Sequence, residues 1–438
     1  MATILLITVG GSPQPIVTAI QALEPDRIIF ICSSGPRGSL SQIIGEGTPC
    51  EVRRGTEIIA QWPNIPTHLG LGDRFNPETD LVQLENPDDL GECYRYITEK
   101  VNEIQTTNPD ARIYADYTGG TKTMSLALGA VALDYGLSLY LTTSTTRENL
   151  IKVERGESTE RAATTLVTVE RTLNQTLPML LEQYHYPAAI AQLKSLLQSL
   201  ELPPEQRQRI RTLITIACAL DAWDRFDHRE AWSHLETQMK HLKSLGLFLK
   251  RVMASRAAID PSFEGTDGIR GHGYEIVQDL LLNADRRATQ ARYDDAVGRI
   301  YRALELLVQI RLKQAYGIQT GDVDLMKLPE NLHLKYDQKR SPYSHKIQLA
   351  LRDSYELLSQ FSDDPLGRLY RERAEAIYDT LQIRNNSLFA HGFQPISTSE
   401  YRRVVDILKT FIKEAIVSVK PTQKNGDPEQ FPKSFAGF

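Results

Sequence analysis

The pattern of the chain changes near residue 172, and this change constrains the fold more than any other feature. Before it, short apolar runs rich in β-branched residues alternate with helical stretches. The clearest runs are residues 3–9, 27–32, 112–115 and 137–142, with further β-rich segments at about 149–154 and 164–170. Strands that alternate with helices imply right-handed crossovers and a mostly parallel sheet. After this point only helical patterns remain, so the sequence predicts an α/β domain followed by an all-α region.

The length of 438 residues exceeds what one hydrophobic core supports, so we expect several domains. A segment with Pro261, several glycines and few apolar residues predicts a linker at 259–273. The predicted parts are an α/β domain at 1–171, a helical connector at 172–273, a second helical domain at 274–420 and a flexible tail at 421–438.

Composition excludes several classes of protein. A formal net charge of −5 argues against a protein that coats nucleic acid without specificity. The four cysteines are scattered without metal-binding spacing, and no apolar stretch approaches the ~20 residues of a membrane span. We therefore expect a cytoplasmic protein that contacts no membrane and has no metal site.

Three loops follow predicted strands and are expected to meet, because the carboxyl ends of parallel strands converge in one crevice. They are Gly10-Gly11-Ser12-Pro13, Ser33-Ser34-Gly35 and the segment 116–123. The last contains Gly119, Gly120, Thr121 and Lys122 at the start of a predicted helix. Unpaired amides at a helix N-terminus, glycines that allow close approach and one ammonium group suit a phosphate.

These loops are neither a Walker A motif nor a dinucleotide fingerprint. Thr121 separates Gly120 from Lys122, and the first loop lacks the third glycine of the fingerprint. A phosphate-rich nucleotide is the favoured ligand, while the alternative that the glycines only form tight turns stays open.

Near the C-terminus, Arg384 and His391 stand seven residues apart in a segment, 371–391, that we predict to be one helix. Seven residues are nearly two turns, so both side chains would share a face with apolar Ile377, Leu381 and Leu388. An arginine on such a stripe needs a carboxylate, a neighbouring chain or a cleft.

This pair suits RNA cleavage without a metal. Histidine can transfer protons near neutral pH, while the arginine fork can stabilise a phosphorane during attack by the 2′-hydroxyl. One Arg–His pair per chain is sparse for this chemistry. A two-fold dimer would bring two such pairs into one groove.

Two alternatives stay open. Arg384 could be a structural residue that is paired with an acid such as Glu305 on a neighbouring helix. A metal-dependent hydrolase could use His228, His234 and His241, although no acidic ligand has matching spacing, and solvated helix positions explain these histidines better.

Taken together, the Gly10–Pro13 loop, the Asp116–Lys122 loop and the Arg384-Asn385 to His391 segment resemble the CRISPR-associated CARF–HEPN ribonucleases of type III systems. The resemblance spans nearly the whole chain. It implies a Rossmann-like CARF domain, a helical connector and a HEPN domain. Asn385 fills the polar place of the HEPN signature.

The resemblance also implies a function. Such proteins are homodimers that bind cyclic oligoadenylate and then cleave single-stranded RNA at a composite HEPN site, so no DNA substrate and no cofactor are expected. Arg384, Asn385 and His391 would cleave the RNA. The residues that would contact the ligand are Gly10, Gly11, Ser12, Ser33, Gly119, Gly120, Thr121 and Lys122.

Two functional alternatives remain within this resemblance. Some CARF domains degrade their ligand, and Thr121 and Lys122 are the candidates for that activity. The chain could also be a nucleotide-responsive regulator or scaffold that turns over no RNA.

Overall fold

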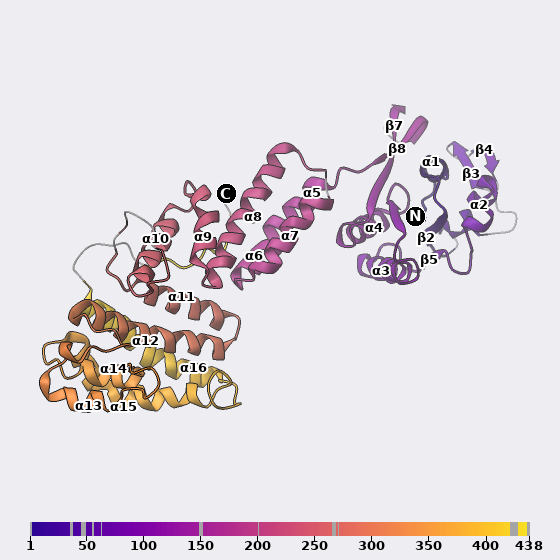
Figure 1. The fold of residues 1–438 in the computed structure, drawn as a ribbon. Coiled ribbons are helices and arrows are strands. Elements are labelled where there is room, and N and C mark those ends of the chain that lie inside the picture. Colours follow the sequence, from indigo (N-terminus) through magenta and orange to yellow (C-terminus); the bar gives the residue numbers. More distant parts are fainter. Residues whose placement is uncertain are drawn as a thin grey trace. The chain divides into compact units, whose positions relative to one another are not determined.

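The computed structural model describes residues 2–35, 38–44, 50–54, 57–62, 64–148, 152–199, 201–264, 269, 271–420 and 428–435. By its internal contacts the chain divides into two compact units, Met1–Thr168 and Val169–Phe438. Each unit is described separately below, and Figure 1 labels their helices and strands.

The first unit is built on a six-stranded sheet with strand order β5-β2-β1-β6-β7-β8. All neighbouring strands are parallel except β7 and β8, which pair antiparallel. A separate antiparallel hairpin is formed by β3 and β4. The elements are β1 (Thr3–Thr8), α1 (Gln14–Leu23), β2 (Arg27–Ser33), η1 (Ser39–Gln42), β3 (Cys50–Arg54), β4 (Glu57–Trp62), α2 (Ile65–Leu69), η2 (Gly72–Arg74), β5 (Leu81–Leu84), α3 (Leu90–Thr107), β6 (Arg112–Asp116), α4 (Lys122–Asp134), β7 (Ser138–Glu148) and β8 (Lys152–Arg161).

Helices cover both faces of this sheet, which explains why the middle residues of β1 and β2 are apolar on both faces. Ile4 and Leu6 of β1 pack in one core with α3 and α4, whereas Leu5 and Ile7 pack in another with α1. Figure 1 shows α3 and α4 on one side of the sheet and α1 on the other. The predicted mostly parallel α/β fold is therefore confirmed.

The end of the sheet differs from the prediction. Residues 164–170, predicted to be β-rich, form most of helix α5 (Thr165–Arg171) instead. The polar residues 155–161, which lie between the two predicted β-rich segments, belong to β8. Because β8 is an edge strand that pairs only with β7, it tolerates polar residues that a central strand would not. Part of the predicted strand 149–154, residues 149–151, lies outside the described residues.

All secondary-structure elements that the structure describes after Val169 are helices, as predicted. A single hydrophobic core extends from Val169 to Phe435, without a break at the predicted domain boundary of 273. That boundary stays a prediction, and residues 265–268 and 270 of the predicted linker lie outside the described residues. The elements after α5 are η3 (Thr172–Thr176), α6 (Leu177–Glu182), α7 (Tyr186–Ser199), α8 (Pro204–Asp224), α9 (His228–Leu235), η4 (Glu236–Gln238), α10 (Lys243–Ala257), α11 (Glu275–Thr289), α12 (Tyr293–Tyr316), η5 (Leu325–Lys327), η6 (Glu330–Leu332), α13 (His333–Asp337), α14 (Leu351–Leu358), α15 (Pro365–Asn385), α16 (Thr398–Val404), η7 (Val405–Lys409) and α17 (Thr410–Val419).

The C-terminal segment 428–435 corrects the prediction of a flexible tail. Phe431 and Phe435 are buried in the helical core, and the Phe431 ring packs edge-on against Trp223. The Gln430 side chain donates to the carbonyl of Leu282 at 3.0 Å. Two large apolar residues in an otherwise polar tail are enough to hold it, because their burial offsets the loss of chain entropy.

Within the described ranges, no helix combines the length and apolar character required to cross a membrane.

Candidate functional site

The crevice that the sequence predicts in the first unit would lie where the strand order of the sheet reverses. From β1 the chain crosses to β2 on one side, and from β6 it crosses to β7 on the other. In open α/β sheets, ligands bind at the carboxyl ends of the strands at such a switch point. The loop Gly10–Ser12 follows β1, and the loop Gly119–Lys122 follows the adjacent β6, so the structure brings these two predicted loops together.

The two loops contact each other through glycines. A Cβ atom on Gly10 would lie 2.7 Å from the amide nitrogen of Gly120, and one on Gly119 would lie 2.3 Å from the carbonyl oxygen of Thr8. Gly120 also has a φ of +82°, which favours glycine. Tight packing therefore explains Gly10, Gly119 and Gly120. It does not explain Gly11, since no heavy atom beyond its neighbours lies within 4 Å of its Cβ position.

Thr121 and Ser33 use their hydroxyl groups within the protein. As the N-cap of α4, the Thr121 hydroxyl accepts from the amide of Met124 at 3.2 Å, and it donates to the carbonyl of Pro87 at 2.7 Å. The Ser33 hydroxyl accepts from the amide of Ser39 at 3.0 Å. The Thr121 hydroxyl hydrogen is used by Pro87, so donation from Thr121 to a ligand phosphate would have to displace that bond.

The groups that face solvent at the crevice are backbone amides and one ammonium group. Gly11, Ser12 and Lys122 are exposed, and α1 begins without a side-chain cap. Lys122 forms no ion pair with any other described residue. The first amides of a helix have no acceptor within it and carry partial positive charge. Two helix starts and a lysine in one crevice suit an anion with several phosphates.

Asp116 is the last residue of β6, directly before the loop that carries Gly119 and Gly120, and it was not predicted as a site residue. Its carboxylate is fully buried, accepts from the amide of Thr118 at 2.9 Å and lies 3.4 Å from the hydroxyl of Thr142, which donates to it. Burial raises the pKa of this carboxyl group, and the hydrogen bonds from Thr118 and Thr142 lower it. The sequence could have indicated Asp116, because it is an acidic residue at the end of a buried strand. The Pro87 carbonyl, which accepts from the Thr121 hydroxyl, could not have been predicted, because any residue can supply a backbone carbonyl.

We expect Gly119→Ala to destabilise the first unit by about 1–3 kcal/mol, the usual range for overpacking, because the new methyl group would collide with the Thr8 carbonyl. Gly11→Ala is the matched control, and its effect is expected to stay within about 0.5 kcal/mol. Denaturant unfolding of the full chain, followed by circular dichroism, measures both. Equal stability of the two variants would contradict the close contact between the loops.

In the second unit, α15 ends at Asn385, so the prediction of one helix over 371–391 is wrong at both ends. Ser387 is buried and its hydroxyl donates to the carbonyl of Arg384 at 2.8 Å, which turns the chain out of the helix. Leu388, predicted to share the apolar stripe, is 64% exposed, whereas Ile377 and Leu381 are buried as predicted. Arg384 and His391 therefore do not meet by helical periodicity.

A compact loop brings Arg384, Asn385 and His391 together instead. The His391 amide donates to the carbonyl of Asn385 at 3.2 Å, and the amide of Gln394 donates to that of Asn386 at 3.3 Å. A Cβ atom on Gly392 would lie 2.0 Å from the Asn386 carbonyl oxygen, so this return of the chain requires glycine. Beyond the turn, the amide of Ile396 donates to Asp294 of α12 at 3.1 Å, which anchors the loop to the bundle.

The side chains of Arg384 and His391 form no ion pair with a described residue, so they are available to a ligand. Arg384 is half-buried over the ring of Tyr301, 4.4 Å from its centroid, and donates to Asn385 Oδ1 at 3.5 Å. Glu305, the acid considered as its partner, pairs with Arg302 at 2.8 Å. Among the described residues no carboxylate pairs with Arg384, and the exposed His391 imidazole forms no hydrogen bond or ion pair.

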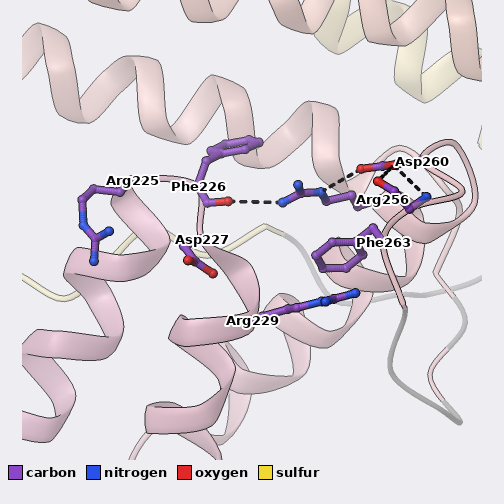
Figure 2. A pocket seen from close by; sticks show the side chains of 8 residues that line it. Arg225, Phe226, Asp227, Arg229, Arg256, Asp260 and Phe263 are labelled. Atoms are coloured by element: carbon purple, nitrogen blue, oxygen red, sulfur yellow. Dashed lines mark hydrogen bonds and ion pairs between the residues drawn. The ribbon is translucent and has the colours of Figure 1, made fainter.

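The helical unit also contains a pocket of about 450 Å³ where α8, α9 and the end of α10 meet (Figure 2). It is lined by Arg225, Phe226, Asp227, Arg229, Arg256, Asp260, Ser262 and Phe263. Each arginine has a carboxylate within 4.0 Å. Since these charges are matched inside the chain, we assign the pocket no ligand.

His228 lies beside this pocket and is fully buried, so the expectation of a solvated position is wrong for it. Its Nε2 lies 3.0 Å from Asp279 and its Nδ1 lies 3.2 Å from the Arg256 guanidinium. Because arginine can only donate, Nδ1 accepts and Nε2 carries the proton. Within the described ranges, no three His, Cys, Asp or Glu residues are placed to hold a metal ion.

Residues 268–414 match the family model described as the Csm6 HEPN domain. The predicted resemblance to the CRISPR-associated CARF–HEPN ribonucleases is thereby confirmed for the C-terminal region.

Two known proteins extend the comparison. The chain is 26% identical over 197 residues to the CRISPR system endoribonuclease Csm6 of Thermus thermophilus, an alignment that covers 43% of this chain and 41% of that relative. It also resembles the structure of Enterococcus italicus Csm6 bound to cyclic hexa-2′-fluoro-hexa-dAMP, with a TM-score of 0.54 and 12% identity over 96% of both chains. The second comparison establishes a shared fold across nearly the whole chain.

Proposed function

We propose that this chain is an endoribonuclease of CRISPR antiviral defence that is activated by cyclic oligoadenylate and cleaves single-stranded RNA without a metal. The observation that carries the proposal is the loop that places Arg384, Asn385 and His391 side by side at the protein surface, with no carboxylate among the described residues on the arginine. The match of the surrounding bundle to the Csm6 HEPN family supports it.

The three side chains divide the chemistry of transesterification among them. The 2′-hydroxyl attacks the adjacent phosphorus, which requires removal of its proton and protonation of the departing 5′-oxygen. His391 suits this proton transfer, because imidazole titrates near neutral pH. Arg384 donates to the phosphorane oxygens, and the Asn385 amide is placed to orient the phosphate. DNA lacks the nucleophile and is not a substrate.

A two-fold dimer completes the site. One chain supplies a single imidazole, which is exposed, whereas the reaction needs both a base and an acid. The loop that carries His391 also exposes Leu388, Phe389 and Phe393, which are 64%, 55% and 90% exposed. A second copy of the chain would cover such apolar residues and bring two Arg–His pairs together.

The ligand is proposed to bind at the switch-point crevice of the first unit. Exposed amides after β1, the start of α4 and Lys122 offer complementary charge to several phosphates. The solved relative of the same fold is bound to a cyclic hexa-adenylate analogue, which supports a cyclic oligoadenylate as activator here. A ring of repeated nucleotides also suits a symmetric pair of crevices.

The decisive assay mixes the purified full chain with a fluorescent single-stranded RNA in EDTA, and adds linear or cyclic tetra- and hexa-adenylate in turn. We expect cleavage that one cyclic adenylate accelerates at least ~10-fold, and no cleavage of a DNA oligonucleotide of the same sequence. Electrophoresis resolves the products. Tight binding of a cyclic adenylate with no RNA turnover would instead indicate a regulator or scaffold.

A further inference from the structure

Arg384 is held by an aromatic ring. Its guanidinium carbon lies 4.4 Å from the centroid of the Tyr301 ring, within the range of a cation–π contact. Tyr301 belongs to α12 and Arg384 to the last turn of α15, and both side chains are half-buried. The other contact of the guanidinium with a described residue is the 3.5 Å hydrogen bond to Asn385 Oδ1.

A ring supports an arginine in a way that a carboxylate cannot. A carboxylate accepts the N–H groups at the edge of the guanidinium and neutralises its charge, so it competes with phosphate. An aromatic face contacts the guanidinium through its π system and consumes none of the five N–H donors. The charge and the planar fork stay available for phosphate oxygens.

The surroundings of the pair fit this arrangement. Glu305, one turn further along α12, is engaged by Arg302 at 2.8 Å and does not compete for Arg384. Burial and Glu305 raise the pKa of the Tyr301 hydroxyl while Arg384 lowers it, so the phenol is neutral near pH 7. Gly298, one turn earlier on the same face, has no atom within 4 Å of its Cβ position, which leaves space beside the pair.

We infer that Tyr301 is a positioning residue of the proposed ribonuclease site: its ring holds the Arg384 guanidinium in place without using any of the N–H donors that the scissile phosphate needs. The inference rests on the proposed function, because it concerns how the catalytic arginine is presented. Tyr301 itself is not proposed to contact the RNA.

Two substitutions separate the ring from the hydroxyl. Tyr301→Phe keeps the aromatic face and removes a hydroxyl that bonds to no described residue, so kcat is expected to stay within about twofold. Tyr301→Leu removes the face, and kcat is expected to fall about 5- to 30-fold with little change in KM, the size of a partly desolvated cation–π contact. Initial rates on the fluorescent RNA in EDTA, with the activating cyclic adenylate at saturation, measure both.

Tyr293→Leu is the matched control. Tyr293 lies on the same helix and stacks on Tyr401 with ring centroids 5.0 Å apart, but it does not contact Arg384. Its loss costs an aromatic pair without disturbing the arginine, so kcat is expected to remain at the parent level.

The inference is overturned if Tyr301→Leu keeps the parent kcat, if Tyr301→Phe is as impaired as Tyr301→Leu, or if Tyr293→Leu loses as much activity. These outcomes are distinct from failure of the proposed function. If Arg384→Ala still cleaves RNA at the parent rate, the ribonuclease site itself is wrong, whatever the Tyr301 variants do.

Discussion

Replacing Arg384 with alanine is expected to lower the rate of RNA cleavage about 10²- to 10³-fold, because one well-placed donor to developing negative charge contributes roughly 3–4 kcal/mol. His391→Ala is expected to lower it about 10²- to 10⁴-fold through loss of proton transfer. Cleavage of the fluorescent RNA in EDTA, at a saturating concentration of the activating adenylate, measures both variants.

The fold is expected to survive both substitutions. Arg384 is half-buried and makes no ion pair with a described residue, while the His391 side chain is exposed. Unfolding temperature and affinity for the cyclic adenylate are therefore expected to match the parent. Substitution of Arg371, which lies on α15 and donates to the Ser359 carbonyl away from the loop, is the control for loss of a cation. Parent-level cleavage by both Arg384→Ala and His391→Ala would refute the assignment.

The buried parts of the fold could be predicted because burial leaves a strong pattern in sequence. Ile4 to Ile7 and Ile28 to Cys32 are continuous apolar runs, as strands covered on both faces tend to be. The start of α4 was likewise indicated, since glycines precede Thr121 and the helix it caps. These features are determined by residues that are close in sequence and by the packing of a single sheet.

The errors arose where a distant contact decides the structure. The run Thr165–Arg171 has β-branched residues, yet Val169 is buried among helices and the segment is helical. At the candidate site of the second unit, the spacing of Arg384 and His391 also fits a helix. The buried Ser387 and the anchor of Ile396 on Asp294, which is 102 positions away, favour a turn.

The prediction of Arg384 and His391 as candidate site residues rested on a partly mistaken structure. Their residue types favour phosphate chemistry, because arginine and histidine suit metal-free cleavage. The spacing of Arg384 and His391 could not predict that a loop brings them together. It also could not predict that the Tyr301 ring, on another helix, packs against Arg384. The sequence likewise could not predict that the Thr121 hydroxyl donates to the Pro87 carbonyl while it caps α4 by accepting from the Met124 amide.

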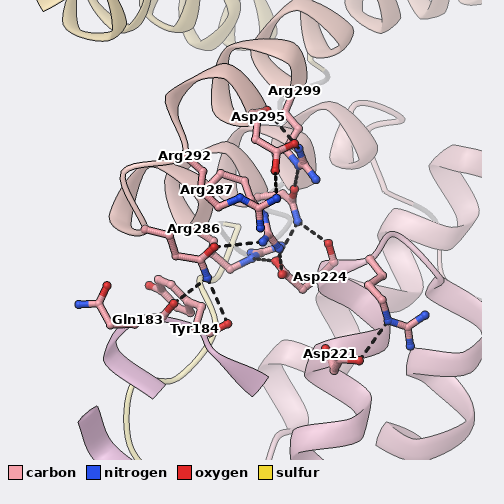
Figure 3. Close-up of polar contacts among 12 residues, drawn as sticks. Gln183, Tyr184, Asp221, Asp224, Arg286, Arg287, Arg292, Asp295 and Arg299 are labelled. Carbon is pink, nitrogen blue, oxygen red and sulfur yellow. Dashed lines mark hydrogen bonds and ion pairs between the residues drawn. The ribbon is translucent and has the colours of Figure 1, made fainter. Parts of the chain in front are cut away.

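A buried ionic cluster joins α8 to α11 in the helical unit (Figure 3). Asp224, at the end of α8, accepts from Arg286 Nε at 2.8 Å, from the Asn283 amide at 3.0 Å and from the nearby Arg287 guanidinium. Arg286 is completely buried, and it also donates to Gln430 of the C-terminal segment at 2.7 Å. Burial lowers the pKa of this guanidinium, which reflects the cost of keeping its charge away from water.

Asp224→Ala is expected to lower the free energy of unfolding by about 3–5 kcal/mol, because it leaves the charge of Arg286 buried without its carboxylate. Asp221→Ala is the matched control one turn earlier on α8. Its partner Arg225 is 54% exposed and keeps Glu230 at 3.1 Å, so the expected loss is at most about 1 kcal/mol. Urea unfolding of both variants, followed by circular dichroism and tryptophan fluorescence, measures the difference. Similar losses for the two variants would mean that the Arg286 charge finds another partner or water, and that Asp224 does not hold α8 to α11.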